Sequence, residues 1–288
     1  MATILITGTS KGIGMATALE FGRAGHTVHA TMRNPAAAPE LAQIAQKEGL
    51  SITVSAMDVD ADASVADGIA AIVRSSGPID VLVNNAGVER RGTTEELPLA
   101  DVRAVMETNF FGALRCIRAV MPEMRIRQRG CIINVTSISG RLSSSPLGAY
   151  AASKHALEAL TEALAQEAKM FNVRVAIVEP GIIDTAMAQR IGEVPDKSNY
   201  PHDRRMAGLF AAALKHPTSP TLVGQKIREI ADGDSWQLRY PVGPDAAPFL
   251  QWRASMTDEQ WVNWGSVDDA AWYEAVQRDF GMDARLPQ

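Results

Sequence analysis

The chain has 288 residues, of which 46% are apolar and 21% charged, and its formal net charge at pH 7 is −5. This composition predicts a soluble globular protein with ample core, and the acidic balance excludes a general nucleic-acid or anionic-membrane binder. No apolar run reaches the roughly 18 residues of a membrane span, and no charged segment precedes the first strand as in a signal peptide. Cys116 and Cys131 lack metal-site or disulfide-framework spacing, so we expect reduced thiols, a cytoplasmic location and no bound metal.

Short apolar segments alternate with longer helical patterns through the first two thirds of the chain. The expected strands span residues 4–6, 27–31, 52–57, 79–84, 131–136 and 173–178. The periodicity predicts a first helix that ends near residue 24. It predicts further helices within residues 36–48, 61–76, 99–108, 110–127 and 150–171. Nearly all-apolar strands that alternate with helices indicate a parallel sheet covered on both faces. The predicted fold class is a doubly wound, Rossmann-like α/β domain.

The regular alternation ends after Pro180-Gly181. A helix over 218–232 and a last strand over 236–240 are expected, and all five tryptophans lie within residues 236–272. We expect a catalytic domain over 1–240 and a Trp-rich C-terminal appendage over 241–288. Residues 182–215 form an insertion that we expect to be a mobile lid over an apolar substrate. Its scattered apolar side chains are Met187, Ile191, Met206, Leu209 and Phe210.

A glycine-rich turn joins the first expected strand to the first helix. Gly8, Gly12 and Gly14 permit tight turning and close backbone approach, and the helix N-terminus beyond them favours a diphosphate. In this strand–turn–helix context the motif indicates a dinucleotide site, with a turn that binds no ligand as the plain alternative. The same turn contains Gly8-x-Ser10-x-Gly12, which fits the nucleophile elbow of a hydrolase. Against that alternative, no upstream strand and loop supply an oxyanion hole, and the downstream histidines show no partner pattern.

The end of the second expected strand distinguishes between two dinucleotides. An acid near this position holds the ribose hydroxyls of NAD(H), whereas an arginine accommodates a 2′-phosphate. Here Arg33 is present, residues 30–34 contain no carboxylate, and Lys11 adds a second cation in the glycine turn. Each side chain alone is compatible with a solvated surface charge, but together they favour NADP(H).

Tyr150 and Lys154 lie four residues apart at the start of a long helical pattern, so their side chains share one face. A nearby ammonium lowers the pKa of a phenol from its usual value of about 10, which predicts an acid/base unit that works near neutral pH. Ser137 follows the strand over 131–136, at the edge where α/β sheets bind ligands. Alone, this spacing also fits a half-buried tyrosine beside a surface lysine.

Residues 3 to about 185 resemble the short-chain dehydrogenase/reductase family of the common soluble type. Its cofactor signature is similar to the turn from Thr7 to Gly14. Its adenine contact resembles Asp58-Val59, and its nicotinamide turn resembles residues 180–185. Residues 84–87, with the sequence Asn-Asn-Ala-Gly, are similar to the motif after its fourth strand. The segments around Arg33 and over 239–243 resemble the branch of 17β-hydroxysteroid and retinol dehydrogenase-like reductases.

The resemblance implies hydride transfer between a nicotinamide and an apolar ketone or secondary alcohol. In that reaction Tyr150 is the acid/base, Ser137 binds the reacting oxygen, and Lys154 lowers the tyrosine pKa and holds the nicotinamide ribose. Asn109 completes the implied catalytic tetrad by supporting the proton relay. A non-catalytic regulator that senses NADP(H) through the same fold is the alternative. The implied cofactor-binding residues are Gly8, Ser10, Lys11, Gly12, Ile13, Gly14, Arg33, Asp58, Val59, Asn85, Ala86, Gly87, Tyr150, Lys154, Pro180, Gly181, Ile183 and Thr185.

The helix over 150–171 has three distinct faces at about 100° per residue. Tyr150 and Lys154 lie on the first, and Glu158 lies on a second, polar face. The third face carries alanines at 152, 156, 159 and 163, and such small side chains let another helix approach closely. That helix belongs either to the same chain or to a second copy. We expect a homodimer or homotetramer in which this face and the helix over 110–127 meet their two-fold mates, as the resemblance also implies.

Overall fold

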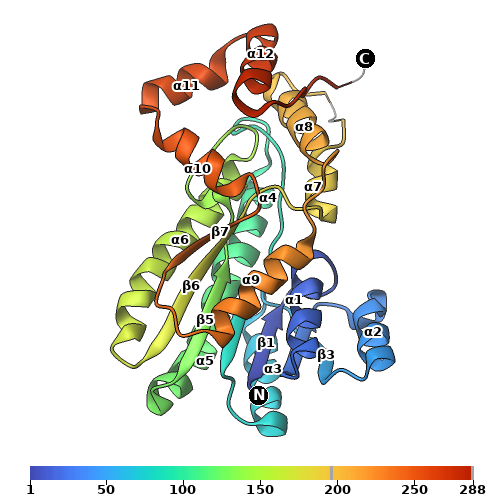
Figure 1. Ribbon diagram of the computed structural model, residues 1–288, viewed down its shortest axis with the longest axis vertical. Helices are drawn as coiled ribbons and strands as arrows, with labels where there is room; N and C mark the ends of the chain where they lie inside the picture. The colour runs from blue at the N-terminus through green and yellow to red at the C-terminus, as the bar shows by residue number, and fades with distance from the viewer. Residues whose placement is uncertain (195–196, 287–288) are drawn as a thin grey trace.

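The structure is a computed structural model that describes residues 1–194 and 197–286 of the chain. Its centre is one sheet in the order β3-β2-β1-β4-β5-β6-β7, in which every neighbouring pair is parallel (Figure 1). This arrangement confirms the predicted doubly wound sheet. The strands are β1 (Thr3–Thr7), β2 (Thr27–Met32), β3 (Ile52–Ala56), β4 (Val81–Asn84), β5 (Gly130–Val135), β6 (Val173–Pro180) and β7 (Arg239–Val242).

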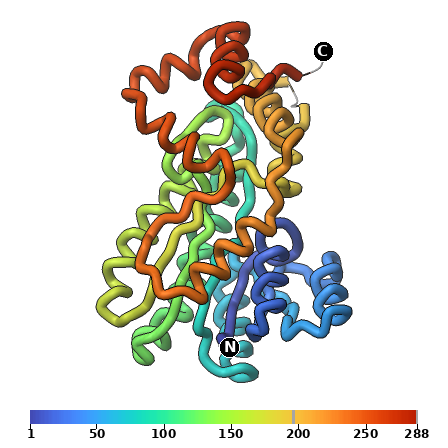
Figure 2. Tube along the Cα trace, in the orientation of Figure 1, coloured from blue at the N-terminus to red at the C-terminus, as the bar shows by residue number. Residues whose placement is uncertain are grey.

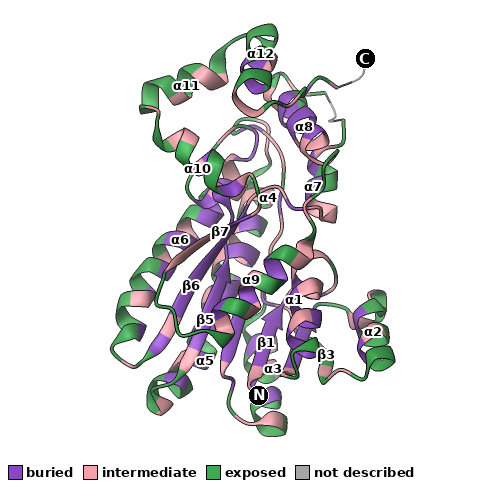
Figure 3. Cartoon of the chain, in the orientation of Figure 1, coloured by how far each residue is buried: buried purple, intermediate pink, exposed green. Residues whose placement is uncertain are grey.

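Helices cover both faces of the sheet. One face packs against α1 (Gly12–Arg23), α2 (Glu40–Glu48) and α9 (Pro220–Asp232). The other face packs against α3 (Asp62–Ser76), α5 (Ala113–Arg127) and α6 (Gly148–Lys169). In β1, Ile4 and Ile6 enter the first core while Leu5 enters the second, and all three are fully buried. Figure 3 shows the resulting band of buried strands, which explains why they are apolar at successive positions.

Most element boundaries differ from the sequence predictions by only one or two residues, and the larger differences have local causes. The last strand, expected over 236–240, is β7 at Arg239–Val242 and includes Pro241, which an edge strand tolerates because one side needs no ladder partner. The second helix lies within the predicted range 36–48, where it starts at Glu40 after the short turn η1 (Pro35–Ala37) and Pro39. The helices expected over 99–108 and 110–127 are instead joined. A π-helical turn, η2 (Glu107–Gly112), links α4 (Leu99–Met106) to α5 without a break.

The rest of the chain lies beyond the carboxyl ends of the strands (Figures 1 and 2). The tail beyond β7 contains α10 (Ala246–Ala254), α11 (Asp258–Ser266) and α12 (Asp269–Phe280). The insertion contains α7 (Ala186–Ile191) and α8 (His202–Ala213), and Figure 2 shows it running beside the tail. Both segments contribute to one apolar cluster: Ile191, Met206 and Leu209 with Trp272, Val276 and Ala284.

The division into a domain over 1–240, a lid over 182–215 and an appendage over 241–288 stays a prediction. Residues 195–196 of the expected lid and 287–288 of the expected appendage lie outside the described residues. Within the part that the structure describes, no helix combines the length and apolarity needed to cross a membrane.

Candidate active site

A cavity of about 1030 Å³ opens at the carboxyl ends of the strands. β1 lies between β2 and β4, so the chain order reverses there, which is the position where open α/β sheets bind ligands. Its volume lies at the upper end of the range of about 300–1,000 Å³ for ligand pockets, and its lining extends from the glycine-rich turn to the tail helices. Every residue expected to bind the cofactor lines it, and so does Ser137, whereas Asn109 does not.

The glycine-rich turn after β1 has a backbone that other residues would strain. Gly8 and Gly12 adopt left-handed φ angles of 71° and 59°. A Cβ on Gly8 would lie 2.6 Å from the Cα of Ala86, and a Cβ on Gly14 would clash with the carbonyl oxygen of Gly8. α1 starts at Gly12 with no side-chain cap on its first N–H groups. The turn therefore offers exposed backbone donors to an anion.

The Asn-Asn-Ala-Gly motif at the end of β4 holds the glycine-rich turn in place through hydrogen bonds. The amide of Asn85 donates to the carbonyl oxygens of Thr7 and Gly8, at 2.9 and 3.0 Å. In return, the hydroxyl of Thr7 accepts from the backbone N–H groups of Asn85 and Ala86, at 3.1 and 3.0 Å. The motif therefore supports the glycine-rich turn, and Asn85, Ala86 and Gly87 also line the cavity.

Two cations face the same end of the cavity. Lys11 and Arg33 are exposed, and neither forms an ion pair within residues 1–194 and 197–286. The sequence indicated no acid at the end of β2, but the structure brings Asp60 there from the segment after β3. Burial raises the pKa of the Asp60 carboxyl, while the Thr108 hydroxyl and the charge of Arg33 oppose that rise. The site thus has two cations at its rim, with one acid, Asp60, near Arg33.

Ser137, Tyr150 and Lys154 meet in the middle of the cavity wall. Tyr150 and Ser137 share a side-chain hydrogen bond, and the Ser137 hydroxyl accepts from the backbone of Ser139 at 3.1 Å. The Lys154 ammonium lies 5.7 Å from the centre of the Tyr150 ring and donates to the carbonyl of Val135 at 2.9 Å. The end of β5 and the first turns of α6 therefore hold all three side chains.

The pKa values of this group differ from the expectation. Burial raises the pKa of Tyr150 to about 12, the hydrogen bond with Ser137 opposes the rise, and the charge of Glu89 adds to it. Burial lowers the pKa of Lys154 to about 8, against the charge of Glu158. The expectation that Lys154 lowers the tyrosine pKa is therefore wrong for this structure, because desolvation outweighs any attraction between the two groups. At neutral pH the phenol keeps its proton.

Asn109 lies in the π-helical turn η2, a type of distortion that is common at functional sites. Its amide donates to the Val88 carbonyl and the Ser153 hydroxyl, both at 2.9 Å, and its oxygen accepts from the N–H of Val88 at 2.8 Å. A Cβ on Gly87 would lie 3.3 Å from that oxygen and 3.7 Å from the Lys154 nitrogen. Asn109 is thus a buried residue whose hydrogen bonds support the chain next to Gly87 and Lys154.

An aromatic chamber forms the part of the cavity under the tail helices. We use this name for Phe249, Trp252, Trp261, Trp264, Trp272 and Phe280, which all line the cavity. Trp261 and Trp264 stack with ring centres 5.6 Å apart and planes 4° apart, and Trp252 meets both edge-on. The apolar side chains of the insertion line the same space: Met187, Ile191, Met206, Leu209 and Phe210. The only signal for this chamber in the sequence was the concentration of tryptophans.

Two carboxylates near the site were missed, the half-buried Asp245 and the buried Glu158. Asp245, at the start of α10, accepts from the N–H of Ile182 at 2.7 Å and lies so close to Gly181 that a Cβ there would clash with it. It ties the tail to the turn expected to contact nicotinamide. Glu158, assigned to the polar face of its helix, shares Arg239 with Glu162 on that face but is only 5% exposed, and its burial was not predicted. No motif pointed to either residue, since each is defined by contacts with distant segments.

A profile of the short chain dehydrogenase family matches residues 2–196. Retinol dehydrogenase 8 from Bos taurus is 37% identical over 236 residues, which cover 80% of this chain and 75% of the relative. The 3-ketodihydrosphingosine reductase of Bacteroides thetaiotaomicron is 33% identical over 246 residues, or 84% of this chain and 87% of the relative. The similarity therefore extends over most of both molecules.

Solved structures with the same fold cover nearly the whole chain. A short-chain dehydrogenase from Streptomyces avermitilis superimposes with a TM-score of 0.78 at 30% identity, covering 91% of this chain and 95% of its own. The actinorhodin polyketide ketoreductase, solved with NADPH, has a TM-score of 0.77 at 27% identity and covers 85% and 97%. The resemblance seen in the motifs thus extends to the complete fold.

Proposed function

The chain belongs to the short-chain dehydrogenase family, and from that premise we propose that it is an NADP(H)-dependent oxidoreductase that interconverts a carbonyl compound and its secondary alcohol. The observation that carries the proposal is the meeting of Tyr150, Ser137 and Lys154 on the wall of one cavity, between the glycine-rich turn and the aromatic chamber. When bound, NADPH supplies the hydride that reduces the carbonyl carbon.

The residues around the glycine-rich turn fit this cofactor. The close contact of Gly8 with Ala86 leaves the backbone open to a diphosphate, and the uncapped N-terminus of α1 supplies donors and a positive dipole. Lys11 and Arg33 would bind the 2′-phosphate, because both are exposed cations without an ion pair in the described parts of the chain. Several solved relatives were crystallised with NADP or NADPH, which supports the same choice.

The protonation states suit reduction at neutral pH. With a pKa of about 12, the Tyr150 phenol carries the proton that the developing alkoxide needs. Ser137 would donate a hydrogen bond to the same substrate oxygen and so stabilise its growing negative charge. Lys154, buried and held by the Val135 carbonyl, would contact the nicotinamide ribose, with Asn109 behind it. The carbon gains hydride, the oxygen gains the tyrosine proton, and Tyr150 is then reprotonated from solvent.

The aromatic chamber supports an apolar substrate. Its six aromatic side chains and the apolar side chains of α7 and α8 surround the space beyond Tyr150. Flat indole surfaces give ring-containing substrates additional contact energy. We therefore propose an apolar ketone that carries an aromatic or fused-ring group, bound with that group in the chamber.

Tyr150→Phe tests the proposed function. The ring still fills its position but the proton donor is gone, so ketone-dependent loss of NADPH absorbance should fall by about 10²–10⁴-fold. NADPH should still quench tryptophan fluorescence in the variant, as in the wild type. A wild-type protein that binds NADPH but reduces no ketone in an aromatic panel would instead support the NADP(H)-sensing regulator. Turnover of Tyr150→Phe at the wild-type rate would exclude Tyr150 as the acid.

We also propose a cytoplasmic homodimer or homotetramer. The alanine face of α6 has no partner helix among the described residues, because Ala152, Ala159 and Ala163 are exposed and Ala156 is half-buried. Met170, at the end of the same helix, is 80% exposed. A second copy would cover this face. Ala159→Arg should halve the mass measured by light scattering, and a monomeric wild type at micromolar concentration would contradict the interface.

A further inference from the structure

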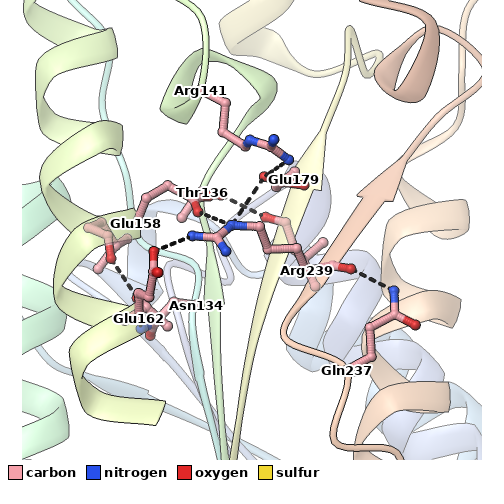
Figure 4. Close-up of polar contacts among 11 residues, drawn as sticks. Asn134, Thr136, Arg141, Glu158, Glu162, Glu179, Gln237 and Arg239 are labelled. Atoms are coloured by element: carbon pink, nitrogen blue, oxygen red, sulfur yellow. Dashed lines mark hydrogen bonds and ion pairs between the residues drawn. The ribbon is translucent and has the colours of Figure 1, made fainter. Parts of the chain in front are cut away.

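Behind the candidate catalytic group lies a cluster of charged side chains around two buried carboxylates, Glu158 and Glu179 (Figure 4). Arg239 of β7 donates to Glu158 at 3.0 Å and to Glu162 at 2.9 Å, both on α6. Glu179, fully buried at the end of β6, lies 3.9 Å from Arg239 and 3.6 Å from Arg141. Removing such charges from water is expensive unless they are paired. The cluster contributes no residue that the reaction itself requires.

Glu158 is the member that reaches the catalytic group. Its second carboxylate oxygen accepts from the Thr136 hydroxyl at 2.7 Å. Thr136 stands between Val135, whose carbonyl accepts from Lys154, and Ser137, which bonds Tyr150. Glu158 also lies one helical turn after Lys154 on α6. Glu158, itself on α6 with Tyr150 and Lys154, therefore links that helix to the segment after β5 that carries Ser137.

The backbone around Glu158 leaves room for its contact with Thr136. The turn after Ser137, η3 (Ile138–Gly140), folds back over α6, and a Cβ on Gly140 would lie 2.8 Å from the Cγ of Glu158. Only a residue without a side chain lets the turn approach so closely. The Thr136 hydroxyl also lies 3.1 Å from the Val178 carbonyl, which joins the same point to β6.

We propose that Glu158, held by Arg239, is a positioning residue that sets the placement of Ser137 and the charge state of Lys154. The inference rests on the proposed function and adds to it a reason for the buried charges. It assigns Arg239, which lies on the last strand, to the support of residues on β5 and α6 that are more than 80 positions earlier in the chain.

The negative charge of Glu158 raises the pKa of Lys154, against the effect of burial that leaves it at about 8. Removing that charge should lower the pKa of Lys154, so its ammonium loses its proton at a lower pH. The alkaline limb of kcat that depends on protonated Lys154 should then move toward acid pH. The other charged groups around Glu158 are Arg141, Lys154, Glu162, Glu179 and Arg239.

The matched pair Glu158→Gln and Glu162→Gln tests the proposal. Both remove one carboxylate that bonds Arg239, but only Glu158 contacts Thr136, and the Glu162 side chain is 56% exposed. Misplacing a reacting group by about 1 Å costs about 10²-fold, so kcat of Glu158→Gln should fall by about tenfold to a hundredfold with KM for NADPH unchanged. Its alkaline limb should shift to lower pH, while Glu162→Gln should keep the wild-type profile.

Two further variants separate positioning from folding. Glu158→Asp retains the charge and should restore the position of the alkaline limb even if kcat recovers only in part. Thr136→Val removes the hydroxyl contact and no charge, so kcat should fall while the limb stays in place; it also decides the question if Glu158→Gln does not fold. If wild-type protein reduces ketones but Glu158→Gln matches Glu162→Gln in kcat and pH profile, the inference is overturned and the proposed function stands. Unchanged kcat in Thr136→Val would overturn the positioning role as well.

Discussion

The cavity joins two regions that are constructed differently, the glycine-rich turn after β1 and the aromatic chamber under α10, α11 and α12. The turn is made of backbone: its donors are N–H groups, and its shape depends on Gly8 and Gly14 having no side chain. The chamber is made of side chains, and its walls come from segments that are far apart in the sequence. Backbone constraints restrict which residues fit, whereas a packed apolar wall accepts many combinations of similar volume.

This difference decides what substitutions should do at each end. At the cofactor end, a changed charge or an added methyl group would disturb a fixed backbone geometry. Substitutions there should therefore have large effects on kinetics, and those effects should be confined to NADP(H). In the chamber the loss of one aromatic wall should be smaller and should depend on the shape of the ketone. Two substitutions, one at each end, can confirm or break this contrast.

Arg33→Asp should have the larger effect. It replaces a cation that lines the cavity beside Asp60 with an acid suited to ribose hydroxyls. A hydrogen bond to a charged group contributes about 1.5–3 kcal/mol and tenfold corresponds to about 1.4 kcal/mol, so kcat/KM for NADPH should fall by about 10–100-fold. The ratio of kcat/KM for NADPH over NADH, measured with one ketone, should fall with it.

Arg74→Asp is the control for the change of net charge. Arg74 is exposed on α3 and does not line the cavity, so its reversal alters the overall charge equally but not the site. An equal loss of NADPH preference in both variants would mean that long-range electrostatics, not phosphate contact, selects the cofactor. The proposed contrast between the two regions would then no longer hold for the cofactor end.

The same contrast explains what the sequence could predict. Gly8, Gly12, Gly14, Asn85, Ala86 and Gly87 all line the cavity, and the sequence showed them because each belongs to a short motif next to a strand, although the two motifs contact each other across 77 and 78 residues. The sheet was predictable for a similar reason, since β1 is buried on both faces and therefore apolar at successive positions. Tyr150 and Lys154 share a helix face by spacing alone.

The wrong or missing predictions concern residues whose surroundings are formed by tertiary contacts with distant segments. The burial of Glu158 on its polar face was missed, because helical periodicity does not show that Arg239 and Thr136 lie beside it. The direction of the Tyr150 pKa was wrong because burial, which depends on the whole fold, outweighs a neighbouring charge. Asp245 had no signal, since its contact with Ile182 spans 63 residues.

Trp264→Leu should have the smaller effect and should act on the ketone alone. Trp264 lines the cavity, stacks on Trp261 and meets Trp252 edge-on, so leucine keeps the wall apolar but removes its flat surface. An aromatic contact adds about 0.5–1.5 kcal/mol beyond its buried area, so kcat/KM for an aryl ketone should fall by up to about tenfold. A compact aliphatic ketone and NADPH should keep their wild-type values.

Trp236→Leu provides the matched control for this variant. Trp236 is 44% exposed, does not line the cavity and lies beneath the Lys169 ammonium, so its loss changes tryptophan content without changing the chamber. Equal losses of kcat/KM for aryl and aliphatic ketones in Trp264→Leu would show that the chamber provides volume and not flat contact surfaces. An unchanged value for both ketones would mean that the substrate does not reach Trp264. A loss limited to the aryl ketone would establish that the tail helices select the shape of the substrate, whereas the glycine-rich turn selects the cofactor.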